Sequence, residues 1–266
     1  MNPMLNIAIR AARKAGNIIA KGYERRDEIT TAQKMANDYV TNIDKAAEQA
    51  IIEIIQKSYP EHTIIGEESG AIEGKQSDIQ WIIDPLDGTT NFIKGFPHFS
   101  VSIAVRVKGR NEIAVVYDPI RNELFTAIRG EGAKLNDTRL RIESRTELQG
   151  AILATGFPFK QNKYMPMHLA MVTALIEHCA DFRRTGSAAL DLCYTAAGRV
   201  DGFFEIGLKP WDCAAGELIV REAGGLICDY LGSPNYLTNG HIIAGSARIV
   251  KNILTKVQPY TSELKS

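Results

Sequence analysis

Apolar residues recur at helical spacing near the start of the chain and again after a polar interruption. The first pattern covers positions 5–19, with charged residues between the apolar ones, and it ends near Gly22. The second covers about 44–55 and must stop before Pro60, because proline cannot continue a helix. Both patterns predict amphipathic helices. The polar segment 30–42 between them is interpreted either as a linker or as a loop that folds over a site.

Short extended runs of apolar and β-branched residues follow the second helix. The last three runs are joined by segments 108–111 and 119–121, which are short enough to force antiparallel hairpins. We therefore expect an antiparallel sheet in the first half of the chain. Its predicted strands are 63–66, 79–84, 99–107, 112–118 and 122–128.

After about residue 145 the pattern changes to helices alternating with strands, which favours a partly parallel sheet. The predicted strands are 151–155, 202–206, 226–229 and 242–244, and the predicted helices are 164–178, 187–197, 211–223 and 247–256. We expect residues 1–147 to form an N-terminal subdomain with an antiparallel sheet. Residues 148–266 would form a C-terminal alternating α/β subdomain that completes the site.

Charge and cysteine usage narrow the class of protein. The 266 residues include 31 basic and 31 acidic side chains, and this balance argues against a broad nucleic-acid surface or a membrane-binding surface. The four cysteines show no metal-binding spacing and are expected to be reduced core residues. Arg10, Arg13 and Lys14 interrupt the first apolar pattern, so neither a signal peptide nor a membrane span is expected. A cytoplasmic location follows as the expectation.

The most informative segment is 81–92, Trp-Ile-Ile-Asp-Pro-Leu-Asp-Gly-Thr-Thr-Asn-Phe. A buried strand delivers Asp84 to its end, and Pro85 is expected to stop the ladder there, outside the core. Asp84 and Asp87 would repel each other in a dry site unless cations neutralise them. The amides of Gly88 and the threonines after it could hold an anion where a helix begins.

Acidic side chains in three separate segments point to metal chemistry. They are Gly66-Glu67-Glu68-Ser69, Asp84-Pro85-Leu86-Asp87 and Pro210-Trp211-Asp212. Oxygen ligands without His or Cys suit Mg²⁺ or Mn²⁺, and carboxylates from distant segments can hold two such ions roughly 4 Å apart. The pattern indicates a two-metal phosphoester hydrolase. Each acidic pair taken alone is more typical of a solvated turn.

Other motifs give weaker indications of function. Segment 70–75 misses the spacing of a phosphate-binding loop and is interpreted as a surface loop, and no histidine accompanies a recognisable nucleophile. Arg183 and Arg184 are candidates for binding phosphate or a partner, with a solvated pair as the alternative. Glu205 is unusual in an apolar strand, which favours a functional acceptor over a structural ion pair.

Together the motifs resemble the magnesium-dependent, lithium-sensitive inositol monophosphatases, most closely their bacterial members. The resemblance covers nearly the whole chain. It rests on segment 81–92, on Trp211-Asp212-Cys213-Ala214-Ala215-Gly216 followed by Glu222-Ala223-Gly224-Gly225, and on Gly66-Glu67-Glu68-Ser69. It implies an α/β fold layered as an α-β-α-β-α sandwich of the sugar and inositol phosphatase type.

The resemblance also implies roles for individual residues. Glu67, Asp84 and the carbonyl of Leu86 would bind one Mg²⁺, and Asp84, Asp87 and Asp212 a second, with a third, weaker ion near Glu67. The catalytic residues would be Glu67 and Thr89, which orient the attacking water, and Asp44, which supports Thr89. Substrate contacts would come from Gly88, Thr89, Ser187, Ala188 and Glu205, and Lys34 would lie near a flexible flap.

The main hypothesis is therefore hydrolysis of inositol 1-phosphate and related small phosphates by metal-activated water, attacking in line without a phosphoenzyme. Mn²⁺ could replace Mg²⁺, and Li⁺ would inhibit. Related folds hydrolyse fructose 1,6-bisphosphate or adenosine 3′,5′-bisphosphate. The rival hypothesis, also implied by the resemblance, is a regulatory protein in ribosomal-RNA antitermination, with Nus factors and RNA polymerase as partners. A homodimer is expected in either case.

Overall fold

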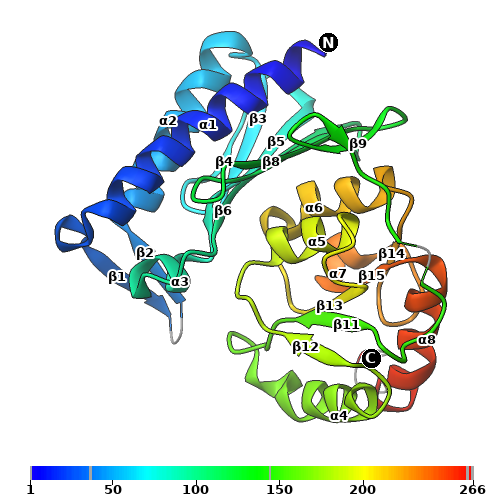
Figure 1. Cartoon of the computed structure of the whole chain (residues 1–266). Helices are drawn as coiled ribbons and strands as arrows, with labels where there is room; N and C mark the ends of the chain where they lie inside the picture. Colours follow the sequence, from blue (N-terminus) through cyan, green and yellow to red (C-terminus); the bar gives the residue numbers. More distant parts are fainter. Residues whose placement is uncertain (1, 36–37, 144, 262–263, 265–266) are drawn as a thin grey trace.

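The computed structural model describes residues 2–35, 38–143, 145–261 and 264. Within these residues the strands form three sheets: the hairpin β1–β2, a large eight-stranded sheet and a small five-stranded sheet. The large and small sheets lie face to face, with helices between them and outside both (Figure 1).

The large sheet is mostly an antiparallel meander in the order β10-β9-β8-β7-β6-β5-β3-β4, with β3 parallel to β5. The predicted hairpins β6–β7 and β7–β8 are confirmed. Its strands are β3 (His62–Gly66), β4 (Gly70–Ile72), β5 (Gln76–Asp87), β6 (Ser100–Val107), β7 (Arg110–Asp118), β8 (Glu123–Ile128), β9 (Gly132–Leu135) and β10 (Thr138–Arg139).

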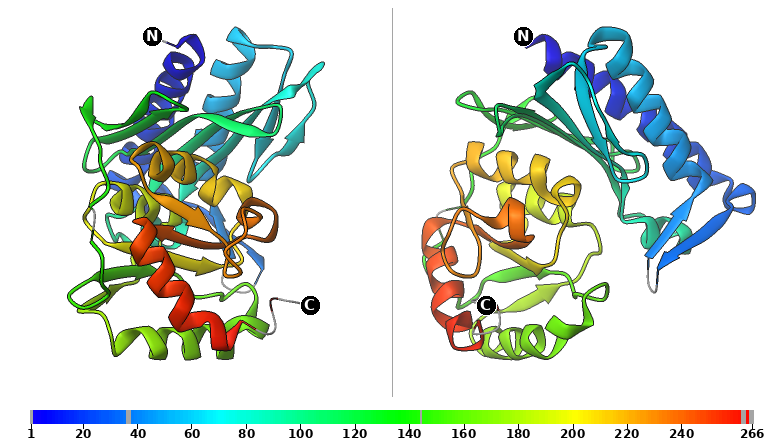
Figure 2. Two further views of the ribbon diagram at one scale, coloured as in Figure 1. Left: turned by 90° about the vertical axis from the view of Figure 1, so that its right-hand side faces the viewer. Right: turned by 180° about the vertical axis from the view of Figure 1, so that it is seen from behind.

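Helices α1 (Pro3–Glu24) and α2 (Asn42–Ser58) run side by side along the outer face of the large sheet (Figure 2). Asn2 caps α1. Thr41 caps α2 through a capping box with Asp44, which satisfies backbone donors at the first turn. Their apolar faces pack with Trp81 and Ile83 from β5, so the two helices predicted from periodicity are confirmed.

Helices α5 (Ala188–Ala196) and α6 (Pro210–Glu222) form the middle layer. They pack with Ile82 of β5, the neighbour of the two residues that face α1 and α2, because alternate strand residues point to opposite faces. A Cβ on Gly216 would lie 2.6 Å from Leu192 Cβ, so only glycine allows α5 and α6 to approach this closely.

The small sheet has the order β12-β11-β13-β15-β14, in which β15 pairs antiparallel with both of its neighbours and the pairs β12–β11 and β11–β13 are parallel. This confirms the partly parallel sheet. The strands are β11 (Ile152–Thr155), β12 (Asp181–Arg183), β13 (Gly202–Ile206), β14 (Leu226–Cys228) and β15 (His241–Gly245). Phe203 faces the middle layer, and Phe204 faces the outer helices α4 (Met165–Ile176) and α8 (Ala247–Val257).

This order of layers, α1/α2, large sheet, α5/α6, small sheet, α4/α8, confirms the α-β-α-β-α sandwich. The division at residues 147–148 stays a prediction, since α6 packs against both sheets. No helix in the described part of the chain is long and apolar enough to cross a membrane. The cysteines are free as expected, but Cys179 is only partly buried and so is not a core residue.

The predicted end of strand 79–84, before Pro85, is wrong. Strand β5 passes through Pro85 to Asp87, because a bulge pairs Asp84 with Ser102 and Asp87 with Ser100 and frees the proline from donating a ladder bond. The two carboxylates thus lie at the end of an interior strand. Asp84 is only 1% exposed, so it is buried rather than outside the core.

Elsewhere the structure adds elements that the pattern did not predict. Segment 30–42 contains the hairpin of β1 (Thr31–Met35) and β2 (Asp38–Thr41), and the predicted surface loop at 70–75 contains the edge strand β4. The other unpredicted elements are β9, β10, β12, α7 (Tyr236–Asn239) and the short helices η1 (Arg26–Glu28), η2 (Asn162–Tyr164) and η3 (Gln258–Tyr260). The helix expected to begin after Gly88 is the short α3 (Thr89–Lys94).

Candidate active site

A cavity of about 620 Å³ is lined by the hairpin, the end of β5, the segment after β11 and the N-terminal ends of α5 and α6. Its volume suits a small phosphorylated ligand. The predicted residues that line it are Glu67, Asp84, Leu86, Asp87, Gly88, Thr89, Arg184, Ser187, Ala188, Glu205 and Asp212. Sequence reasoning therefore placed residues from distant segments around one cavity.

Four carboxylates reach this cavity from three elements. Asp84 and Asp87 end β5, and Asp212 lies in the first turn of α6. Glu67 follows β3, and its amide donates a 3.1 Å hydrogen bond to the carbonyl of Ile83, the residue before Asp84. The parallel pairing of β3 with β5 thus places Glu67 beside the aspartates.

The electrostatics of the four carboxylates indicate an excess of negative charge. Burial raises the pKa of all four, to about 7 for Glu67 and to about 8 for Asp212. Repulsion from Glu67 and Asp87 raises the pKa of Asp84 further, well above its ordinary value. Such a cluster is stable only when it holds protons or when cations neutralise it.

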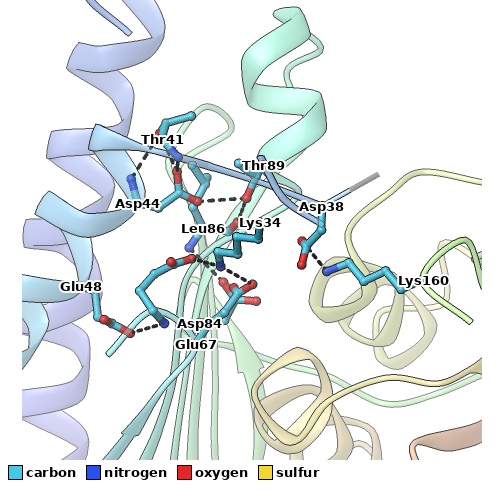
Figure 3. A network of polar contacts seen from close by, with 11 residues as sticks. Lys34, Asp38, Thr41, Asp44, Glu48, Glu67, Asp84, Leu86, Thr89 and Lys160 are labelled. Carbon is cyan, nitrogen blue, oxygen red and sulfur yellow. Dashed lines mark hydrogen bonds and ion pairs between the residues drawn. The ribbon is translucent and has the colours of Figure 1, made fainter. Parts of the chain in front are cut away.

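Lys34 supplies one positive charge from the hairpin. Its ammonium lies 2.5 Å from Glu68 Oε1 and 3.4 Å from Glu67 Oε1, and Figure 3 shows it pointing at the acidic loop. Lys34 thus lies beside the predicted ligand Glu67, and its belonging to a movable flap stays a prediction. Glu68 was not among the predicted site residues.

The donor set fits hard divalent cations, because it consists of carboxylate oxygens and the Leu86 carbonyl. Among the described residues, no three His, Cys, Asp or Glu side chains converge as a ready-made metal cage. Lys34 instead contacts one of the predicted ligands. The assignment of each carboxylate to a metal therefore stays a prediction.

Thr89 lines the cavity, and Asp44 lies behind it in hydrogen-bond contact with its hydroxyl. The Thr89 hydroxyl lies 2.9 Å from Asp44 Oδ1 and 3.0 Å from the Leu86 carbonyl. Asp44 also accepts hydrogen bonds from the amide and hydroxyl of Thr41, at 2.8 and 2.5 Å. Asp44 is 1% exposed, and burial raises its pKa. Because the Thr89 hydroxyl donates its hydrogen toward Asp44 and Leu86, the Thr89 oxygen can accept a hydrogen bond from another group.

Gly88 precedes the short helix α3 with φ +100°, a conformation that favours glycine. A Cβ there would lie 3.0 Å from the His98 carbonyl and 3.2 Å from Phe99 Cβ, so a larger residue would also be crowded. Both features explain why glycine stands at this bend. Binding of phosphate by the amides of Gly88 and Thr89 stays a prediction.

The N-terminus of α5 contacts Asp87. The Ser187 hydroxyl donates a 2.6 Å hydrogen bond to Asp87 Oδ2, and the Ala189 amide donates another at 2.8 Å. The side chain of Ala188 is 7% exposed, so little of it faces a ligand. Ser187 and Ala188 thus line the cavity, and the hydroxyl of Ser187 is hydrogen-bonded to Asp87.

Glu205 lies on β13 against Gly156, where a Cβ would come 2.1 Å from its Oε1. Burial and repulsion from Asp191 raise its pKa well above the ordinary value. No hydrogen bond to the Glu205 carboxyl is present among the described residues. The expectation that it serves as an acceptor stays a prediction.

The two predicted arginines differ. Arg184 lines the cavity, whereas Arg183 lies outside its lining and donates a 2.5 Å hydrogen bond to Asp181. The polar residues of the cavity lining that were not predicted include Asp38, Lys160 and Asp191. Lys160 Nζ lies 2.7 Å from Asp38 Oδ1, and Asp191 Oδ1 accepts a hydrogen bond from the Thr185 hydroxyl at 2.7 Å. Of these only Lys160 had a local signal, as the first charge after Phe157-Pro158-Phe159.

Comparison with known proteins gives one consistent result. Residues 1–262 match the profile described as "Inositol monophosphatase family". The "Nus factor SuhB" of Pasteurella multocida is 73% identical over 263 residues, covering 99% of this chain and 98% of that protein.

Solved structures of similar proteins have the same fold as this chain. The extragenic suppressor protein suhB from Bartonella henselae superposes with a TM-score of 0.94 at 40% identity, covering 97% of this chain and 99% of that one. The Thermotoga maritima IMPase gives a TM-score of 0.89 at 33% identity, covering 99% and 100%. The chain therefore belongs to the inositol monophosphatase family.

Proposed function

We propose that this protein is a Mg²⁺-dependent phosphatase that hydrolyses inositol 1-phosphate and related small phosphomonoesters. One observation carries the proposal: Glu67, Asp84, Asp87 and Asp212 line one cavity, where burial raises the pKa of each and repulsion from the others raises the pKa of Asp84 and Asp212 further. Family membership supports the same activity.

Glu67, Asp84 and the Leu86 carbonyl would hold one cation, and Asp84, Asp87 and Asp212 a second, with a weaker third site at Glu67. When bound, Mg²⁺ or Mn²⁺ supplies Lewis acidity that acidifies water and neutralises charge on the phosphate. A cation held by Glu67 would replace the 3.4 Å contact of Lys34 with that carboxylate. Li⁺ would inhibit by competing for these oxygens.

The chain itself orients the reactants. Asp44 holds the Thr89 hydroxyl so that its oxygen accepts a hydrogen bond from the attacking water, and Glu67 accepts the second hydrogen bond. The amides of Gly88 and Thr89 hold the phosphate, so that the water attacks in line with the leaving oxygen. Ser187, Ala188 and Glu205 would contact the leaving alcohol, and Phe157, Pro158 and Phe159 line the same cavity as an apolar wall.

The test is phosphate release from inositol 1-phosphate, with Mg²⁺ titrated and Li⁺ then added. Asp87→Asn should lose several kcal/mol of transition-state stabilisation, by the general scale of Lewis-acid catalysis. Asp78→Asn is the matched control, since Asp78 lies exposed on the same strand. Near-normal turnover by Asp87→Asn would reject the assignment. Fructose 1,6-bisphosphate and adenosine 3′,5′-bisphosphate in the same assay test the alternative substrates.

A second function is favoured by the name of the relative that is 73% identical, "Nus factor SuhB". This function is association with Nus factors and RNA polymerase in the cytoplasm, with the protein as a homodimer. Sedimentation tests the dimer. Capture of purified RNA polymerase and Nus factors by wild type and by Asp87→Asn tests the partners; equal capture supports a surface separate from the phosphatase site.

A further inference from the structure

Helix α2 carries two buried acids one turn apart, Asp44 and Glu48. They are 1% and 3% exposed, and residues spaced by four lie on the same helix face. Asp44 contacts Thr89. Glu48 has no part in the proposed reaction, and an unused buried carboxylate next to the site calls for an explanation.

Glu48 contacts the acidic loop after β3. Its Oε1 accepts a 3.1 Å hydrogen bond from the amide of Glu68, and Figure 3 shows its side chain pointing at this loop. Burial raises the pKa of Glu48, while hydrogen bonds from the amide of Glu68 and from Ser69 lower it. The loop amides thus compensate the buried carboxylate.

The approach is close enough to select the residue at position 66. A Cβ on Gly66 would lie 2.1 Å from Glu48 Oε1 and 2.7 Å from Ser69 Oγ. The φ of Gly66 lies outside the left-handed region, so glycine is required here for space and not for backbone conformation. Glycine at 66 therefore makes room for Glu48.

Glu67 is held from both sides as a result. Its own amide donates to the Ile83 carbonyl at 3.1 Å, and the next amide, that of Glu68, donates to Glu48. The first bond ties the loop to β5 directly before Asp84. The second ties it to the helix that positions Thr89.

We propose that Glu48 is a positioning residue that fixes Glu67, so that helix α2 sets both groups that orient the attacking water, Thr89 through Asp44 and Glu67 through Glu48. This inference rests on the proposed function. A positioning residue behind a metal ligand typically contributes a factor of about 10 to 100 in metal affinity or activity.

The first experiment is hydrogen exchange of the metal-free protein in the peptide covering residues 64–70. Glu48→Ala should speed exchange there about tenfold or more, because the Glu68 and Ser69 amides lose their acceptor. Glu48→Gln keeps an acceptor oxygen and should restore protection. Glu53→Ala, an exposed acid on the same helix, should exchange like wild type. Wild-type exchange in Glu48→Ala would overturn the proposal.

The second readout is Mg²⁺ binding by calorimetry, with the Mg²⁺ dependence of turnover beside it. The half-saturating Mg²⁺ concentration should rise about 10- to 100-fold in Glu48→Ala. If that variant fails to fold, Gly66→Ala displaces the Glu48 carboxylate and should give the same two changes. Unchanged exchange and Mg²⁺ binding in a folded variant would overturn the proposal. Absence of turnover by wild type would instead reject the proposed function, since exchange requires no substrate.

Discussion

Ser187 donates its hydroxyl hydrogen to Asp87 Oδ2 at 2.6 Å, across 100 positions of sequence. The bond joins the last residue of β5 in the large sheet to the residue that caps α5 in the middle layer. It lowers the pKa of Asp87, against the burial that raises it. Ser187 thereby keeps a predicted metal ligand closer to its charged form.

Ser187→Ala should therefore weaken Mg²⁺ binding by about tenfold at neutral pH, the scale of one hydrogen bond to a charged group. Loss of the α5 cap should also lower the free energy of unfolding by about 1 kcal/mol. Calorimetry and urea unfolding measure the two effects.

The matched control is Ser246→Ala, because Ser246 caps α8 by accepting from the Ile249 amide at 3.2 Å. It should lose a similar stability and leave Mg²⁺ binding unchanged. Equal Mg²⁺ affinities of Ser187→Ala and Ser246→Ala would show that Ser187 is only a helix cap.

Thr89→Val removes the hydroxyl that contacts Asp44 while keeping a β-branched side chain of similar shape. If this hydroxyl orients the water, kcat at saturating Mg²⁺ should fall about 10²- to 10⁴-fold. Thr89→Ser keeps the hydroxyl and should retain most of the turnover. Steady-state kinetics of both variants decide the point, and a Val variant as active as the Ser variant would refute the role.

The contiguous motifs explain why much of the cavity could be predicted from sequence. Asp84, Asp87 and Gly88 follow a buried apolar run, and that run alone indicates a strand ending in a polar turn. The four carboxylates do meet at one cavity, although their metal roles are untested by the geometry.

Other features of the fold and of the cavity correspond to no recognisable pattern in the local sequence. All five residues of β1 are exposed, so the strand has no alternation of buried and exposed positions to recognise. Lys160 meets Asp38, and Ser187 meets Asp87, only through packing of segments distant in sequence. The bulge at Pro85 likewise depends on which strand pairs with β5 and not on the proline itself.

Mg²⁺ binding should depend on pH through the protons that the site holds. Glu67 and Asp212, with pKa values of about 7 and about 8, are mostly protonated at pH 6 in the metal-free protein. Cations must displace these protons, so affinity should rise from pH 6 to pH 8 and then level off. Calorimetry at pH 6.5 in two buffers of different ionisation enthalpy should detect proton release. The same affinity at pH 6 and pH 8 would contradict this electrostatic account.

Asp191 should make the metal-free protein less stable as pH rises. It is 2% exposed, and burial raises its pKa from 3.8 to about 8. Between these values the folded state binds a proton that the unfolded state lacks. Its contribution is therefore full below about pH 4 and is lost as pH rises through about 8, with a slope of about 1.4 kcal/mol per pH unit.

Asp191→Asn stays neutral and can still accept the hydrogen bond from Thr185. The variant should be more stable than wild type at pH 8, and this difference should shrink as pH falls toward 4. Urea unfolding in the presence of a chelator at pH 5 and pH 8 measures it, with Asp78→Asn as the exposed control. A stability difference that is the same at both pH values would mean that Asp191 is charged in the folded protein, held by Arg184.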